Sequence, residues 1–460
     1  MVCYYSSWAN YRPNEGKYTV QDIPVEQCTH IIYAFALLDS NTLTIKSGDP
    51  FFDTAMGHNN YGAFINLKSR NPQAKFLLGL GGWTDSHAKN KYSRLVSESD
   101  LRSAFVKHVV SFLVDHNFEG LDLDWEFPGY GDRTQDKQGF LLWVQELRAA
   151  FDPLGLLLTA AVSAEKGVID RGYDVEGVSK ALHQIHLMTY DRYNPSQTSN
   201  HAPLFQTPGS NPLFAYYLEK GAPAEKLILG VPLYGRSFTL AGSDRSVGAE
   251  SSGPGSPGPL MQISGSLAYY EICRAEKEDG WTKVSAADGP HLTNGVEWVG
   301  YDDVETVTKK AQYVRERGLG GIMVWDIATD DFLGLCGKGV NPLISAAERT
   351  LCQATTTTDG PPDPVTTTST TTTSTIPASQ PASQTRAHTS RQPASQPAIP
   401  GLPTNKAIVG SQDEDGPSNQ PSLRSVVAVK GGGRTVFTPT SHTNASSSSL
   451  CPSLCVFSSL

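Results

Sequence analysis

One stretch of the chain, Phe118–Pro128, reads Phe-Glu-Gly-Leu-Asp-Leu-Asp-Trp-Glu-Phe-Pro and alternates acidic with bulky apolar residues. Successive side chains of a β-strand point to opposite faces, so Asp122, Asp124 and Glu126 are predicted to share one face. Three carboxyl groups on one face repel one another, which favours a functional relay with Glu126 at its open end. The alternative is a solvated edge strand protected by its charges. The apolar residues between the acids and the proline that ends the run argue against that alternative.

Short apolar segments of the same kind recur along the chain as far as Trp325. Eight of them are predicted as strands: Val2–Ser6, His30–Phe35, Phe76–Leu80, Leu121–Glu126, Leu156–Val162, Ile185–Tyr190, Leu227–Leu233 and Gly321–Trp325. Helical periodicity lies between most of them, as in Leu101–His116 and Gln138–Phe151. Alternating strands and helices indicate a parallel sheet, and eight strands predict an α/β fold, the closed (β/α)₈ TIM barrel. A Rossmann fold is disfavoured because no Gly-x-Gly-x-x-Gly motif follows the first strand.

Two further regions complete the predicted organisation. Residues 237–299, between the seventh and eighth strands, are too long for a simple crossover and predict a small inserted α+β domain beside a cleft. After Cys352 the composition changes to Thr-rich sequence and Pro-Ala-Ser-Gln repeats. Such sequence buries too little apolar surface to offset the entropy of ordering, so residues 353–460 are predicted to be a disordered tail. The tail resembles O-glycosylated stalks, and Asn444 is a possible N-glycosylation site. Residues 1–352 are therefore the predicted folded domain.

Charge and cysteine content restrict the partners and the compartment. The net charge of −9 disfavours nucleic acids and anionic membranes, and no apolar run is long enough to span a bilayer. The cysteines are Cys3, Cys28, Cys273, Cys336, Cys352, Cys451 and Cys455. They form no Cys-x-x-Cys pair, and their odd number and wide spacing fit a few disulfides in an oxidising compartment. The sequence begins without a signal peptide. Either the protein is intracellular or the sequence lacks its true start, and we favour the second, with an extracellular location.

Aromatic residues gather where the predicted strands end, the position of functional groups in TIM barrels. The strand-end residues are Trp83, Glu126, Tyr190, Asp191, Tyr234, Arg236 and Trp325, and Tyr4, Trp8, Tyr11 and Phe35 lie near the first two strands. Sugar rings present flat C–H faces to aromatic rings, and their hydroxyls need polar partners. The collection therefore predicts a carbohydrate-binding cleft, although core packing is the alternative for each ring taken alone.

The segment Gly120–Phe127 closely resembles the Asp-Gly-x-Asp-x-Asp-Trp-Glu signature of family 18 chitinases. Further matching motifs are Tyr4–Ala9, Gly81–Ser86, Met188–Asp191, Tyr234–Phe238 and Gly320–Asp326. The resemblance extends from Cys3 to Cys352 and is strongest to arthropod and chitotriosidase-type animal enzymes. It implies a TIM barrel with an inserted α+β domain that hydrolyses internal β-1,4 bonds of N-acetylglucosamine polymers. It also implies a monomer that binds chitin and chitooligosaccharides and uses neither a metal nor another cofactor.

The resemblance also implies a role for each matching residue. Glu126 would protonate the glycosidic oxygen, its pKa raised by the neighbouring acids. Asp124 would hold the substrate's acetamide N–H, Asp122 would share a proton with Asp124, and Tyr190 would bond the acetamide oxygen. The implied substrate-binding residues are Tyr4, Trp8, Phe35, Gly81, Gly82, Trp83, Met188, Asp191, Tyr234, Arg236 and Trp325. The implied disulfides are Cys3–Cys28 and Cys273–Cys336.

The sequence departs from the family pattern at two places. Glu119 stands where the family usually has Asp; we expect it on the other face of the strand, with reduced activity at most. Arg192–Ser196 replaces a Phe-His-Gly segment with a nearby Trp, which predicts weaker product-side binding. The alternative to an enzyme is a chitin-binding lectin or growth-factor-like relative, but such relatives typically lack the glutamate found here at Glu126. A structural protein built around the tail is a weaker third hypothesis.

Overall fold

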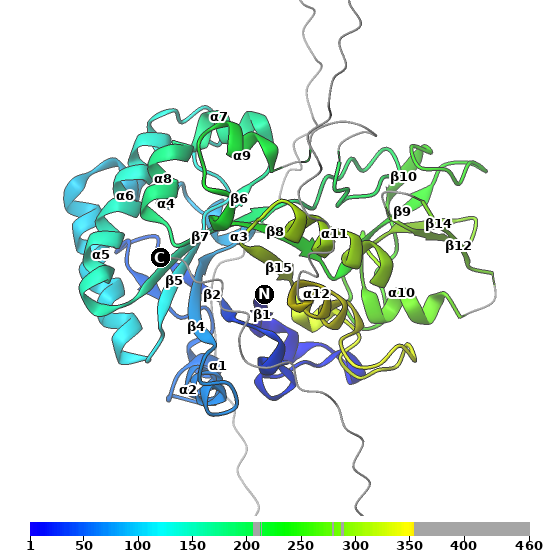
Figure 1. Cartoon of the computed structure of the whole chain (residues 1–460), viewed down its shortest axis with the longest axis horizontal. Helices are drawn as coiled ribbons and strands as arrows, with labels where there is room; N and C mark the ends of the chain where they lie inside the picture. The colour runs from blue at the N-terminus through cyan, green and yellow to red at the C-terminus, as the bar shows by residue number, and fades with distance from the viewer. Residues whose placement is uncertain (206–211, 213, 278–279, 287–288, 354–460) are drawn as a thin grey trace, which may run out of the picture. The chain divides into compact units, whose positions relative to one another are not determined.

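The computed structural model describes residues 1–205, 212, 214–277, 280–286 and 289–353 (Figure 1). The predicted tail features, including Asn444, Cys451 and Cys455, lie outside the described residues. Eight parallel strands close into a barrel in the order β1-β15-β8-β7-β6-β5-β4-β2, with β1 paired to β2. They are β1 (Val2–Ser6), β2 (His30–Leu38), β4 (Lys75–Gly81), β5 (Gly120–Asp124), β6 (Leu157–Ser163), β7 (Gln184–Met188), β8 (Leu227–Pro232) and β15 (Gly321–Trp325). The predicted TIM barrel is confirmed.

The strand β5 lies in the barrel wall between β4 and β6, and all five of its residues are buried. The edge-strand alternative is therefore wrong. The strand is also shorter than predicted, because it ends at Asp124. Strand alternation places Asp122 and Asp124 on one face, but Glu126 follows the strand and is positioned by other contacts.

Helices surround the barrel, as Figure 1 shows for α4 to α8. The α-helices outside the insertion are α1 (Pro50–Asp53), α2 (Asn60–Asn66), α3 (Trp83–Ser86), α4 (Lys91–Ser97), α5 (Ser99–Asp115), α6 (Gln135–Phe151), α7 (Lys166–Gly172), α8 (Val175–Ala181), α9 (Ala215–Glu219), α11 (Val304–Glu316) and α12 (Pro342–Cys352). Short 3₁₀ helices are η1 (Ser7–Tyr11), η2 (Asn14–Gly16), η3 (Val20–Asp22), η4 (Val25–Gln27), η5 (Leu67–Ser69), η6 (Asp152–Leu154), η7 (Ala224–Lys226) and η8 (Ile327–Thr329). Both predicted helices are present. Among the described residues, none of the helices has the length and apolar composition needed to span a bilayer.

Two apolar clusters stabilise the barrel from opposite sides of its wall. Outside the wall, α5 buries Phe105, Val109 and Leu113, whose spacing of four residues places them on one helical stripe. Inside the barrel, a smaller cluster contains Val2, Tyr4, Ile32, Ala34, Leu77, Ile228 and Met323. The barrel is thus filled with side chains, which leaves its carboxyl-terminal mouth as the place for chemistry.

The segment between β8 and β15 forms a second, antiparallel sheet of order β10-β9-β14-β13-β12, with β11 paired to β9. Its elements are β9 (Tyr234–Leu240), β10 (Ser251–Pro254), β11 (Ser266–Ala268), α10 (Tyr269–Ala275), β12 (Thr282–Val284), β13 (His291–Thr293) and β14 (Glu297–Gly300). Figure 1 shows these elements on one side of the barrel. The sheet begins at Tyr234, so Tyr234 and Arg236 belong to its first strand rather than to the end of the seventh barrel strand.

Two disulfides and one short hairpin tie the barrel elements together. Cys3 of β1 is bonded to Cys28 before β2, and Cys273 of α10 is bonded to Cys336 after β15. These are the two expected pairs, and the second joins the insertion to the barrel. The strand β3 (Ile45–Lys46) pairs antiparallel with the end of β2.

Candidate active site

Asp122 is fully buried in β5 and is held by three side chains from other barrel strands. The Tyr4 hydroxyl donates to Oδ2 at 2.6 Å, and the Thr159 hydroxyl donates to Oδ1 at 2.6 Å. Nδ1 of His186 lies 3.1 Å from Oδ1. The carboxyl group therefore has a fixed orientation inside the barrel, with hydrogen bonds from both sides.

A polar row continues from Asp122 into the barrel interior. His186 Nε2 lies 3.2 Å from the amide oxygen of Gln184, and the Gln184 amide nitrogen lies 3.5 Å from His30. Burial and the nearby N-terminal charge lower the pKa of His30 to about 3, so this end of the row is neutral. Sequence analysis missed Thr159 and His186. His186 could have been found from the sequence, because it is a polar residue within the apolar run Ile185–Met188. Strand alternation also places it on the same face as Gln184 and Met188.

Asp124 ends β5 and has one carboxyl oxygen without a partner. Oδ1 is buried and accepts no hydrogen bond from the described residues. Burial, and then the charges of Glu126 and Asp122, raise the pKa of Asp124 well above its ordinary value. A buried oxygen without a donor is costly unless a ligand satisfies it. Asp124 is therefore prepared to meet a hydrogen-bond donor that the described residues do not supply.

The glycines at the end of β4 allow the backbone to pass close to Asp124. The Gly82 N–H donates to the Asp124 carbonyl at 2.8 Å. A Cβ atom at Gly81 would lie 2.2 Å from the same carbonyl oxygen, and one at Gly82 would lie 2.9 Å from the Phe35 ring. Both residues also have φ angles in the region that favours glycine. Their role is to bring strands β4 and β5 together, and Gly82 also makes room for Phe35.

Glu126 is half-buried just beyond β5. Its backbone N–H donates to the Ser86 hydroxyl at 2.9 Å, which ties it to α3. Burial, and then the charge of Asp191, raise the pKa of Glu126 to about 7. The pKa is raised as expected, but the main cause is burial, and the charge that adds to it belongs to Asp191 rather than to the acids of the strand.

Asp191 is paired with two residues of the insertion. Its Oδ1 accepts from the Tyr234 hydroxyl at 2.6 Å and from Arg236 Nε at 2.8 Å, and its Oδ2 accepts from Arg236 Nη2 at 2.5 Å. Burial would raise the pKa of Asp191, but hydrogen bonds from His201 and Arg236 hold it below its ordinary value. Asp191 therefore stays charged, which is what its effect on Glu126 requires.

The loop after Asp191, where the sequence departs from the family pattern, supports Arg236. Tyr193 stacks on Phe238 of β9 with ring centroids 4.9 Å apart, and the Arg236 guanidinium lies 5.5 Å from the Tyr193 ring. In place of the family's Phe-His-Gly segment, this loop thus carries a ring that packs against Arg236, a predicted substrate-binding residue. Sequence analysis assigned no role to Tyr193.

Four aromatic rings from three barrel strands and η1 pack together at the mouth of the barrel. Phe35 stacks on Trp325 at 5.7 Å and on Trp8 at 6.0 Å, and Tyr4 meets Trp325 edge-on at 5.5 Å. Trp8 remains 42% exposed, which leaves part of its ring open to a ligand. The predicted residues are therefore brought together here, in contact with the apolar cluster inside the barrel.

Two more predicted residues join this cluster, and Trp83 lies elsewhere. Met188 and Tyr190 pack against the same interior cluster, and the Tyr190 hydroxyl lies 3.7 Å from the Met323 sulfur. Trp83 packs instead on His87, with ring centroids 4.1 Å apart, and is 58% exposed. Glu119 lies at the amino end of β5, where its carboxylate contacts Lys68, Lys75 and the backbone N–H of Phe76. The expected reduction of activity stays a prediction.

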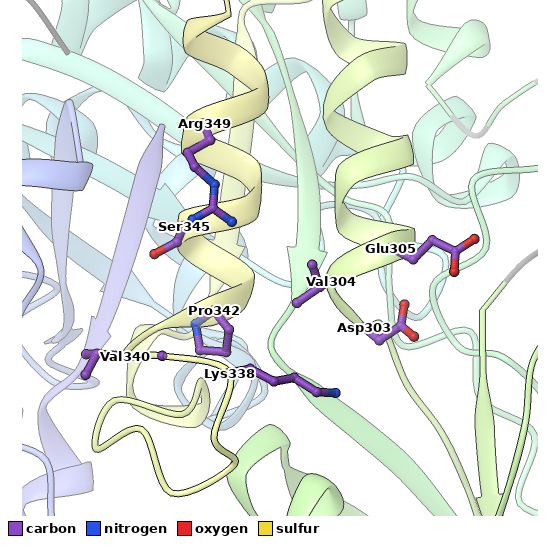
Figure 2. A pocket seen from close by; sticks show the side chains of 9 residues that line it. Asp303, Val304, Glu305, Lys338, Val340, Pro342, Ser345 and Arg349 are labelled. Carbon is purple, nitrogen blue, oxygen red and sulfur yellow. The ribbon is translucent and has the colours of Figure 1, made fainter. Parts of the chain in front are cut away.

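Two other features contain none of the predicted catalytic or substrate-binding residues. Cys273, Asp331 and Cys336 approach one another closely enough to suggest metal ligands, but the two cysteines form a disulfide. A cavity of about 500 Å³ lies between the start of α11 and α12 (Figure 2). It is lined by Asp303, Val304, Glu305, Lys338, Gly339, Val340, Pro342, Ser345 and Arg349. In the cavity lining, Asp303 already accepts from the Thr306 N–H and from Lys283 Nζ.

Comparisons with known proteins show that the chain is similar to chitinases. The chain is 42% identical over 370 residues to Probable chitinase 10 of Drosophila melanogaster, covering 76% of this chain but 16% of that protein. It is 41% identical over 371 residues to an Endochitinase of Manduca sexta, covering 75% of this chain and 66% of that protein. The chain thus spans less than two thirds of the length of these relatives.

Solved structures of related proteins are also similar to this chain. A mutant of catalytic domain 2 of the Ostrinia furnacalis Group II chitinase, in complex with (NAG)5, is 43% identical with a TM-score of 0.72. The match covers 76% of this chain and 95% of that one. Human YKL-39, described as a pseudo-chitinase with retained chitooligosaccharide binding, is 36% identical with a TM-score of 0.69, over 76% of this chain and 99% of that one. Residues 1–330 match the model of glycosyl hydrolases family 18, and the chain belongs to that family.

Proposed function

We propose that this protein hydrolyses internal β-1,4 bonds of chitin and N-acetylglucosamine oligomers and retains the anomeric configuration. One observation carries the proposal: Glu126 is a carboxyl group with a pKa of about 7, two residues beyond a buried Asp124 that has an unsatisfied oxygen. A group that changes protonation near neutral pH can act first as an acid and then as a base. The family relationship and the chitin-oligomer complex of a related structure support the same substrate.

The first step breaks the glycosidic bond. Protonated Glu126 donates its proton to the glycosidic oxygen as that oxygen leaves the anomeric carbon. Most retaining glycosidases attack with a second carboxylate, whereas this family uses the substrate's own acetamide group. In our proposal the free Oδ1 of Asp124 accepts the acetamide N–H, and the Tyr190 hydroxyl donates to the acetamide oxygen and orients it. That oxygen attacks the anomeric carbon, and an oxazolinium ion forms.

The second step restores the enzyme. Glu126, now a carboxylate, removes a proton from water, and the water oxygen attacks the anomeric carbon and opens the oxazolinium ring. Two inversions at the same carbon give net retention. In our proposal Asp122 shares a proton with Asp124, and the hydroxyl groups of Tyr4 and Thr159 hold the Asp122 carboxyl group in place.

The remaining residues position the sugar chain. Trp325 would form the floor beneath the distorted sugar, with Tyr4, Phe35 and Met188 packed beside it. Gly81 and Gly82 would keep the backbone close to the acids. The proposed positioning residues for sugars on either side of the scissile bond are Trp8, Trp83, Asp191, Tyr234 and Arg236.

We further propose that residues 1–352 act as a secreted monomer that requires neither a metal nor another cofactor. Two disulfides favour an oxidising compartment over the cytosol. The insertion, residues 237–299 with the start of β9, would form one wall of the substrate-binding cleft.

Hydrolysis of a fluorogenic chitotrioside tests the proposal. We expect turnover by the full chain, none above background for Glu126→Gln, and a first-formed product with the β anomeric configuration by NMR. The competing hypothesis is a chitin-binding lectin, as the description of YKL-39 as a pseudo-chitinase suggests for that relative. Absence of turnover together with binding of chitin oligomers would establish the lectin hypothesis.

A further inference from the structure

The short helix α3 supports the end of β5 through one buried hydroxyl group. The Ser86 hydroxyl accepts from the Glu126 N–H at 2.9 Å and donates to the Asp124 carbonyl at 3.3 Å. It therefore uses both its donor and its acceptor function on the two residues that flank Trp125. Ser86 is buried, so water does not readily replace these two bonds. The backbone that carries both acids is thus held by a side chain that the mechanism does not use.

Asp85, the residue before Ser86, is a buried charge that holds α3 in place. Its Oδ2 accepts from the Tyr92 hydroxyl at 2.7 Å and from the Leu38 N–H at 3.1 Å, and its Oδ1 pairs with Lys91. Lys91 is also buried and donates to the Leu38 carbonyl at 2.7 Å. These partners belong to the end of β2 and the start of α4. The helix α3 therefore cannot shift against β2 or α4 without breaking a buried ion pair, which is a costly change.

Tyr92 supports the same segment through its aromatic ring. The ring stacks on that of Trp125, with centroids 5.5 Å apart and an angle of 20° between the planes. Trp125 is the residue before Glu126, and it is buried. The carboxylate of Asp85 therefore supports the segment after β5 by two routes. One route is the Ser86 hydroxyl on the next residue, and the other is the Tyr92 side chain, which contacts Asp85 at its hydroxyl and Trp125 at its ring.

We propose that four side chains form a clamp that positions Glu126 for proton transfer. They are Asp85, Ser86, Lys91 and Tyr92. This inference rests on the proposed function and assigns positioning residues to it, because the four act through the segment that carries Glu126. A group that transfers protons must be held within about 0.5 Å of its working position. Glu126 follows the last residue of β5, so the pairing of barrel strands does not supply this precision, and the clamp does.

The first measurement is of kcat and KM with a fluorogenic chitotrioside. Ser86→Ala removes both hydroxyl bonds, and we expect kcat to fall by about 10- to 100-fold while KM stays within about twofold. Ser86→Thr keeps the hydroxyl and should restore most of kcat. Tyr92→Phe keeps the ring on Trp125 but removes a donor to Asp85, and we expect kcat to fall by about 3- to 10-fold.

The second measurement is hydrogen exchange at the Glu126 amide, which needs no turnover. Because this N–H donates to the Ser86 hydroxyl, Ser86→Ala should speed its exchange by about tenfold or more, as followed by mass spectrometry of peptides that cover Glu126. Ser179→Ala is the matched control, because it removes a buried hydroxyl of α8 that donates to the Val175 carbonyl at 2.6 Å. It should change neither the exchange rate at Glu126 nor kcat.

The two measurements separate this inference from the proposed function. If the parent chain does not hydrolyse the substrate, the proposed function fails, while faster exchange at Glu126 in Ser86→Ala still supports the clamp as the device that holds this residue. In an active parent, an unchanged kcat in Ser86→Ala overturns the clamp, and in an inactive parent an unchanged exchange rate does so. Circular dichroism and melting temperature verify that each variant is folded. If Ser86→Ala does not fold, Tyr92→Phe takes its place in both measurements, with the same outcomes.

Discussion

Two glutamates at opposite ends of β5 have the same side chain but opposite surroundings. Glu119, before the strand, forms ion pairs with Lys68 and Lys75, at 3.1 Å for Lys75, and accepts the Phe76 N–H at 3.1 Å. Burial would raise the pKa of Glu119, but these contacts lower it below its ordinary value. Glu126, after the strand, has a pKa raised to about 7 by burial and by Asp191.

The difference teaches that the neighbouring strands and loops, rather than the acidic sequence itself, decide which glutamate does chemistry. Cations and a backbone donor stabilise the charged form of Glu119, so it is a structural group at the amino end of the barrel. Low solvent access and a nearby anion stabilise the neutral form of Glu126, so it can carry a proton at neutral pH.

The largest effect is expected from Glu126→Gln, which removes the transferable proton and keeps the shape. General acid–base catalysis contributes about 10²- to 10⁴-fold, so we expect kcat to fall by at least about 10³-fold. Initial rates with a chitotrioside from pH 4 to pH 9 would measure it. In the parent chain the rate should decline as the pH rises above about 7, because Glu126 loses its proton there. A rate for Glu126→Gln within tenfold of the parent would refute the assignment.

The same variant should alter stability in a pH-dependent way. The folded-state pKa of Glu126 lies above its ordinary value of 4.5, so the folded state holds a proton that the unfolded chain releases. Its contribution to the unfolding free energy is therefore present at low pH and is lost as the pH rises to about 7. Glutamine does not ionise, so Glu126→Gln keeps its stability as the pH rises. Its free energy of unfolding should exceed that of the parent by about 2 kcal/mol at pH 8 and by little at pH 4. Thermal unfolding at the two pH values measures this difference.

The next effect in size is expected from Asp191→Asn, which removes the anion that helps to raise the pKa of Glu126. With that charge gone, the pKa of Glu126 should fall, and the alkaline limb of the pH–rate profile should move to lower pH. Loss of the charged hydrogen bonds from Arg236 should also reduce kcat/KM by about 10- to 100-fold. Asp170→Asn is the control, because Asp170 also accepts from a tyrosine and a cation, Tyr216 and Lys166, on the outside of the barrel. A limb that stays in place in Asp191→Asn would contradict the role of Asp191.

The strand that separates Glu119 from Glu126 could be predicted from sequence. The contacts that shift the pKa values of these two glutamates in opposite directions could not. Hydrophobic patterning predicted all eight barrel strands, because each is a short, mostly apolar run and helical segments lie between most of them. Strand parity placed Asp122 and Asp124 together. It also placed Glu126 with them, but the strand ends at Asp124, so the position of Glu126 depends on Ser86 of another loop. Such contacts join residues far apart in the chain and leave no local pattern.

The partners of the acids were the least predictable part of the site. Thr159 and His186 donate to or approach Asp122 from β6 and β7, which depends on the register between strands. Tyr234 and Arg236 were placed at a barrel strand end, yet they reach Asp191 from the first strand of the insertion. Resemblance to a family identified these residues, while the structure explains how a second sheet brings them to the barrel.

A smaller effect is expected from Thr159→Val, which removes one donor to Asp122 and keeps a branched side chain. We expect kcat to fall by about 3- to 10-fold with little change in KM, because Thr159 positions Asp122 and does not touch the substrate. Thr350→Val is the control, because it removes a buried hydroxyl of α12 that donates to the Ala346 carbonyl at 2.7 Å. Both variants should lose some stability, but only Thr159→Val should lose kcat. Equal kcat values for the two variants, at a temperature where both are folded, would contradict the role of Thr159 in positioning Asp122.

The smallest effect is expected from Glu119→Gln, the counterpart of the first variant at the other end of β5. Because the pKa of Glu119 is lowered, its contribution to stability is present above its ordinary value and is lost as the pH falls through the folded-state pKa. The variant should therefore lose the part of the pH dependence of melting temperature that lies on the acid side, and pairs of this kind contribute about 0.2–1 kcal/mol. Its kcat should stay within about twofold of the parent, because the carboxylate contacts lysines and a backbone amide rather than the acids that do chemistry. A large loss of kcat with an unchanged melting curve would show that the two ends of the strand are coupled and that the division between them is wrong.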